Sequence, residues 1–124
     1  MKIKLLTLLN SNSIMSELHE QKMNGAVAFK LSQIIDEMEH RFKLYNETRT
    51  KIIKDNNGVL DKEENKYVFE TKEIEDNADK EHDELLQQEV EINCRPLTAS
   101  DLEKIPDLEP KKLRIISWAI DKEQ

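Results

Sequence analysis

Two short acidic sets that include a histidine have the spacing of metal ligands on a helix. Glu37 and His40 form a Glu-x-x-His set, and Asp79 and His82 form a similar one. This is the spacing by which one helix supplies two ligands to a carboxylate-bridged di-iron pair, and two antiparallel helices could bring the sets together. Such a site must lie in a bundle core, whereas the residues around both sets are charged. The sequence therefore favours surface histidines among i,i+4 charge pairs.

Two Glu-x-x-Glu sets have the spacing that all-helical nucleotide pyrophosphatases use to bind magnesium. They are Glu17 with Glu20 and Glu81 with Glu84. Those enzymes draw several carboxylates into one groove with apolar walls, whereas the first set here falls in a short predicted helix. The chain has no Gly-rich phosphate loop, no Cys/His metal cluster and no nucleophile-elbow pattern. We therefore predict a protein without enzymatic activity, cofactor or metal, and we keep a metal-dependent nucleotide hydrolase as the second alternative.

The strongest pattern in the chain is an apolar stripe with steps of three and four residues. Its positions are Ala28, Leu31, Ile35, Met38, Phe42, Tyr45, Arg49 and Ile52. This spacing keeps side chains on one side of a helix, so it predicts a long helix from about residue 24 or 25 to about residue 55 with a narrow packing seam. The five apolar positions that we expect to serve in packing or self-association are Leu31, Ile35, Met38, Phe42 and Tyr45.

A second helix over about residues 71–88 is the natural antiparallel partner of the first. Its own apolar stripe is thin, with Ile74, Ala78, Leu85 and Leu86. Part of the long seam would then remain for a second subunit, which predicts a homo-oligomer. Arg49 interrupts the seam, either to reach past it with its aliphatic stem or to pair with an acid on the facing helix and fix register.

Negative charge is concentrated in one part of the chain. The net charge is −7, from 19 basic and 26 acidic residues, and residues 61–91 hold 13 acids against four lysines. The simpler interpretation is a solvated helix face. The alternative is a negative surface that attracts a basic partner or imitates nucleic-acid phosphates. A net-acidic surface argues against direct nucleic-acid binding, because phosphate contacts supply most of its non-specific affinity. The acids proposed for this face are Glu73, Glu75, Asp76 and Asp79.

Short elements flank the two long helices. Alternation predicts a strand over residues 1–6, and Ser11 or Ser13 could cap a short helix that ends near residue 24. Residues 59–60 and 67–69 flank a polar run and predict a β-hairpin with a charged tip, or alternatively a mobile loop with a few apolar anchors. A strand over residues 90–94, ended by Pro96, is expected to pair with the N-terminal strand.

The C-terminal part is expected to hold two short helices. Ser100 to Glu103 has a capping-box pattern that opens the first. Pro106 ends it, and Pro110 suits the first turn of the last helix, whose stripe runs to Ile120. Trp118 on that helix is more plausible as a core or docking anchor than as a ligand-stacking residue.

These elements predict one elongated domain over residues 1–124. Charged residues make up 36% and hydrophobic residues 37% of the chain, with two Gly and three Pro, as in elongated helical proteins with limited cores. The predicted fold is α+β and mainly α: a long antiparallel helical hairpin on a small antiparallel β-sheet, with short C-terminal helices. No segment predicts a membrane span or an export signal, and the single cysteine, Cys94, fits a reducing cytoplasm.

The order of segments resembles a family of small proteins of unknown function from phages and prophages of Gram-positive bacteria. The resemblance rests on residues 1–6, 28–31, 45–53, 83–92 and 102–118. It implies a viral (bacteriophage) protein in the bacterial host cytoplasm and carries over no catalytic residue. We predict a protein that acts by protein–protein interaction, as an assembly or accessory factor that self-associates in coiled-coil fashion, without contact to a membrane. The alternative is an inhibitor of a host defence or nucleic-acid enzyme that uses the acidic 61–91 face.

Overall fold

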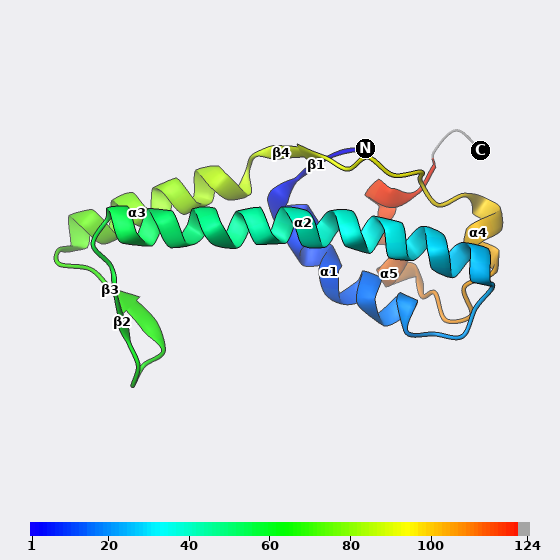
Figure 1. Ribbon diagram of the computed structural model, residues 1–124, viewed down its shortest axis with the longest axis horizontal. Helices are drawn as coiled ribbons and strands as arrows, with labels where there is room; N and C mark the ends of the chain where they lie inside the picture. Colours follow the sequence, from blue (N-terminus) through cyan, green and yellow to red (C-terminus); the bar gives the residue numbers. More distant parts are fainter. Residues whose placement is uncertain (122–124) are drawn as a thin grey trace.

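A long helix, α2, forms the axis of the molecule, with the other helices beside it and a β-hairpin projecting from one end (Figure 1). The computed structural model describes residues 1–121. The elements in chain order are β1 (Lys2–Lys4), α1 (Leu5–His19), α2 (Gly25–Asp55), β2 (Val59–Asp61), β3 (Lys66–Val68), α3 (Lys72–Leu86), β4 (Glu89–Glu91), α4 (Ala99–Glu103), α5 (Pro110–Ile115) and the 3-10 helix η1 (Ser117–Ala119). The predicted mainly helical α+β class is confirmed.

Helix α2 begins and ends where the sequence predicts. The side chain of Asn24 accepts hydrogen bonds from the backbone N–H groups of Ala26 and Val27, which have no partner within the helix. Asn57 ends the helix in the left-handed region, with φ 56°. Gly58 follows at a close approach, since a Cβ there would lie 2.7 Å from Cγ2 of Ile53. Only glycine lets the chain turn so tightly into the hairpin.

Helix α3 runs back along the distal half of α2, which confirms the predicted helical hairpin (Figure 1). The hydroxyl of Thr71 accepts from the backbone N–H of Ile74 and caps its N-terminus. At the loop end the amide of Asn77 donates to the side-chain oxygen of Asn56 at 3.0 Å. Of the residues in α3, Ala78 is the one that is fully buried. The α2–α3 contact is therefore narrow.

Strands β1 and β4 form the predicted antiparallel pair at the base of the helical hairpin. Ile3 lies opposite Val90, and Lys4 lies opposite Glu89. Strand β4 is shorter than predicted, because it ends at Glu91 and not near Cys94. Strands β2 and β3 form a separate two-stranded sheet, the predicted hairpin.

The prediction for the N-terminal part is wrong in three respects: the strand is shorter, the helix begins earlier, and the helix ends at His19 rather than near residue 24. The strand stops at Lys4, and α1 begins at Leu5. Ser11 lies in the middle of α1, fully buried, rather than at its cap. Its hydroxyl donates to the carbonyl of Thr7 at 2.8 Å and accepts from Nε1 of Trp118 at 2.8 Å. A serine whose hydroxyl bonds the preceding turn is tolerated inside a helix.

Two C-terminal boundaries also differ from the prediction. The capping box consists of Thr98 and Asp101, so α4 begins at Ala99, two residues earlier than a cap at Ser100 would place it, and Ser100 lies inside the helix. The last helix begins at Pro110 as predicted but ends at Ile115, where the chain tightens into η1. A backbone hydrogen bond from Leu97 to Ala119 competes with a longer helix by tying this segment to residues before α4.

The buried side chains gather where α1 crosses the proximal half of α2 and meets the C-terminal helices. An ion pair between Lys30 and Asp101 at 2.6 Å, with both side chains mostly buried, joins α2 to α4. None of the helices in residues 1–121 is both long and apolar enough to cross a bilayer. The fully buried large side chains are Leu8, Met15, Leu18, Val27, Leu31, Ile34, Met38, Ile92, Leu97 and Ile116.

Candidate functional site

The predicted seam of α2 packs within the chain itself. Leu31 and Met38 are completely buried, and Ile35, Phe42 and Tyr45 are half-buried against the same core. The side chains chosen for packing or self-association therefore have packing partners in their own chain, and little of their surface remains open to a second copy.

Tyr45 marks the end of that core. Its hydroxyl lies 2.7 Å from Nε2 of His82, and the two rings are tilted at a centroid distance of 5.8 Å. This contact joins α2 to α3 and holds His82 as a structural partner. Among residues 1–121, no group of three or more His, Cys, Asp or Glu side chains is arranged to hold a metal ion. The Glu37–His40 and Asp79–His82 sets therefore do not converge.

Beyond Tyr45, a cleft of about 290 Å³ opens between α2, α3 and the hairpin. Arg49 lines it and forms no ion pair with any described residue, so of the two roles considered for Arg49 the pairing with a facing acid is not formed. Its walls come from three elements that are far apart in the sequence. The lining residues are Arg49, Ile52, Ile53, Lys66, Tyr67, Phe69, Glu75, Ala78, Asp79 and His82.

The hairpin beside this cleft exposes apolar side chains on both of its faces. Val59 lies opposite Val68, and Leu60 lies opposite Tyr67. Opposed residues share a face, and neighbouring residues alternate between faces. The four side chains are 69%, 47%, 43% and 40% exposed in that order. Figure 1 shows the hairpin projecting from the distal end of α2, away from the helices. An isolated two-stranded hairpin is only marginally stable in water.

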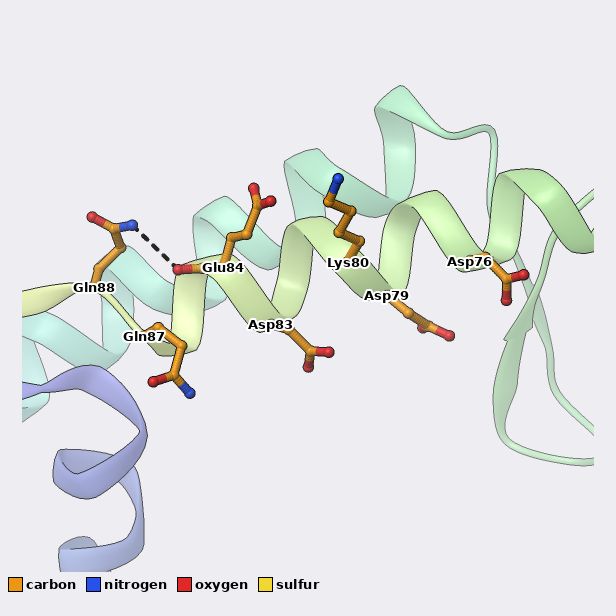
Figure 2. Close-up of a pocket in the computed structure, with 7 residues that line it drawn as sticks. All are labelled: Asp76, Asp79, Lys80, Asp83, Glu84, Gln87 and Gln88. Carbon is orange, nitrogen blue, oxygen red and sulfur yellow. Dashed lines mark hydrogen bonds between the residues drawn. The ribbon is translucent and has the colours of Figure 1, made fainter.

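Helix α3 presents acids along the side that faces the hairpin. Figure 2 shows Asp76, Asp79 and Asp83 pointing to one side of the helix, whereas Lys80 and Glu84 point to the other. Asp76 pairs with Lys72 at 3.2 Å, and its hydrogen bond raises the pKa of that lysine. Asp79 and Asp83 have no ion-pair partner among residues 1–121. The predicted acidic face is therefore open and only partly neutralised.

The other acids named from the sequence divide between the two sides of α3. Glu75 is half-buried and lines the cleft, whereas Glu73 is exposed and lies on the far side, beside Lys80. The acidic face and the cleft meet at Asp79, which lines both the cleft and the shallow groove drawn in Figure 2. We call the hairpin residues 59–69, the cleft and the acidic side of α3 the tip surface.

Trp118 and Cys94 have structural roles. The Trp118 ring is half-buried against the core, and its Nε1 donates to Ser11, as expected of a core anchor. The Cys94 thiol donates to the carbonyl of Gln33 at 3.3 Å. Burial, reinforced by nearby Glu37, raises the pKa of this thiol and keeps it protonated. Neither residue belongs to the tip surface.

The apolar hairpin residues were not singled out as functional from the sequence. The available signal was that Val59, Leu60, Tyr67 and Val68 are apolar at consecutive positions, which leaves neither face of a two-stranded sheet polar. The cleft gave no such signal, because Arg49, Tyr67 and His82 meet only in the folded chain.

No family model, curated protein or solved structure gives a significant match to this chain. Evidence on its function therefore comes from the chain's own residues.

Proposed function

We propose that this protein acts by binding a basic partner protein through the tip surface. The observation that carries the proposal is the exposed apolar hairpin beside an acidic helix face. Apolar side chains that are 40–69% exposed on both faces of one small element have no role in the core. Contiguous exposed apolar surface rimmed by polar residues is typical of protein interaction sites.

The charge of this region decides the class of partner. Residues 61–91 carry 13 acids against four lysines. A surface of this sign speeds encounter with basic partners and disfavours acidic ones. The seam of α2 is filled by the chain's own side chains and offers little surface to a second copy. We therefore favour the acidic face as the binding surface over self-association through the seam. A phage accessory factor and an inhibitor of a host enzyme are both compatible with this mode of action.

Self-association through the hairpin is the second candidate. Both β2 and β3 are edge strands of a two-stranded sheet. Open edges are templates for pairing with another strand. Two hairpins could therefore combine into a four-stranded sheet, although the acids at each tip would oppose that contact.

The test is affinity capture from host lysate with matched variants. The bait is the tagged protein, the site variant is Val59→Ser with Val68→Ser, and the control is Phe29→Ser. Phe29 is 61% exposed on the proximal half of α2. We expect the wild type and the control to retain one protein with a basic isoelectric point, which the site variant loses and which salt releases. Equal capture by all three baits, or capture of an acidic protein, would contradict the proposal.

A further inference from the structure

The cleft of the tip surface is large enough to hold one or two side chains. Its volume is about 290 Å³, which is at the lower limit of the roughly 300–1,000 Å³ that pockets for drug-sized ligands occupy. Ile52, Ile53 and Phe69 supply apolar wall, and Tyr67 from the hairpin closes one side. Aromatic side chains, tryptophan and tyrosine above all, are frequent anchors that fill such pockets at protein interfaces.

The lining of the cleft carries charges of both signs. Arg49 and Lys66 lie in the lining together with Glu75 and Asp79, and Lys66 is also paired with Glu64 at 2.8 Å. A charged side chain that entered would meet a like charge on one wall and lose its hydration. The lining therefore favours an uncharged apolar occupant.

Charge is not balanced just outside the cleft. Asp79 lies at its edge, and Asp83 follows one turn further along α3, about 6 Å away along the helix axis. Neither has an ion-pair partner among the described residues. Basic side chains of a partner could bind there while a neighbouring apolar side chain occupies the cleft.

We propose that the cleft binds an apolar anchor side chain of a basic segment of the partner, with lysines or arginines one helical turn away bound along Asp79 and Asp83. This inference rests on the proposed function and adds the recognition rule: an apolar anchor within about one turn of at least two basic residues. Arg49 contributes by repelling a basic residue from the cleft and so fixing the register of the segment.

The test uses fluorescence anisotropy with two labelled peptides as probes. Both carry four lysines, and they differ only in a central tryptophan or alanine. We expect the tryptophan peptide to bind the wild-type protein at least tenfold more tightly than the alanine peptide. Tyr67→Ala removes one wall of the cleft, and the fold should tolerate the change because the Tyr67 side chain is already 40% exposed. This variant should reduce the ratio of the two affinities to less than threefold, while peptide binding stays dependent on salt.

Two further variants separate charge from the anchor. Asp79→Lys with Asp83→Lys should weaken both peptides by more than tenfold, because it reverses the field at the cleft edge. Glu20→Lys with Glu103→Lys is the matched control, because both acids are exposed and lie outside the tip surface, and it should weaken both peptides by less than threefold. A third peptide with lysine at the central position tests Arg49, and an Arg49→Ala variant should reduce the preference for the tryptophan peptide over this one.

Equal binding of the tryptophan and alanine peptides to the wild type would overturn the anchor proposal, as would failure of both to bind at low salt. Equal binding leaves the basic-partner proposal intact, because that proposal fails only in the capture experiment. If the protein alone doubles its mass in solution and Tyr67→Ala abolishes the doubling, a second copy occupies the cleft and the proposal is wrong.

Discussion

At the scale of single residues, the sequence indicates which side chains matter but does not predict which residues they contact. In the sequence, His82 has the spacing of a metal ligand. In the fold, it forms a hydrogen bond with the hydroxyl of Tyr45. Trp118 was expected to be an anchor, and its indole N–H identifies what it is anchored to, the buried hydroxyl of Ser11. Sequence periodicity predicts which face a residue lies on, but the atom that it bonds depends on the distant segment that reaches that face.

The Tyr45–His82 hydrogen bond is the first residue-scale prediction. Tyr45→Phe removes the hydroxyl from a half-buried contact between α2 and α3, and it should lower the free energy of unfolding by about 1 kcal/mol. Urea denaturation measures the loss. Tyr67→Phe is the control, because that hydroxyl has no hydrogen bond to a described residue, and equal losses for the two variants would contradict the account.

The Lys30–Asp101 pair predicts a dependence on pH. Burial raises the pKa of Asp101, but hydrogen bonds from Lys30 and Thr98 outweigh it, so the net pKa lies below the usual value. A lowered pKa contributes stability above the unfolded pKa, about 3.9, and that stability is lost as the pH falls through the lower folded pKa.

Asp101→Asn should therefore reduce stability at pH 6 by about 1–2 kcal/mol, and the difference from wild type should shrink below about pH 3.9. Urea denaturation at pH 6 and at pH 2.5 measures both differences. A difference that stays constant between the two pH values would show that the ionised carboxylate contributes nothing.

At the scale of elements, boundaries were predictable where local signals agree and were missed where two interpretations compete. The sequence predicts the start of α2 at residue 24 or 25, where Asn24 caps the helix, and its end at the Asn56–Asn57–Gly58 turn. The segment from Leu5 to Leu9 is apolar except for Thr7, and its pattern suits either a strand or a helix. Burial of Ser11 and its bond to Trp118 decide for the helix, and no local pattern could indicate a contact with a residue more than a hundred positions away.

Two serines distinguish these interpretations of α1. Ser11→Ala should lower the free energy of unfolding by about 1–3 kcal/mol, because it leaves the partly buried Trp118 N–H without its acceptor. Ser13→Ala should change it by less than about 0.5 kcal/mol, since Ser13 is exposed inside the helix. Thermal unfolding of the two variants measures both, and a larger loss for Ser13→Ala would place the helix start where the capping pattern suggested.

At the scale of the whole molecule, stability and the candidate function lie at opposite ends. The fully buried side chains of α2 all lie between Val27 and Met38, whereas the distal half of α2 is covered by α3, which has one fully buried residue. The separation follows from the charge pattern, which was visible in the sequence. The cleft between the hairpin and both helices was not, because its walls come from three elements.

Because the core lies at one end of α2, we expect local stability to decrease along the helix toward the hairpin. Amide hydrogens of α2 in residues 29–42 should exchange only through global unfolding, whereas those in residues 46–55 and in α3 should exchange through local opening at least about tenfold faster. Hydrogen exchange followed by NMR resolves the two halves. Uniform protection along α2 would show that the helical hairpin is part of one cooperative unit with the core.

The most direct test of the central claim is an NMR titration of the isotope-labelled protein with the basic partner retained in the capture experiment. We expect amide shift changes in residues 58–69, in Ile52 and Ile53, and on α3 from Glu75 to Asp83, with residues 27–38 of α2 unchanged. Changes confined to the α2 seam, or to the core end around α1 and α5, would contradict the assignment of the tip surface as the binding site.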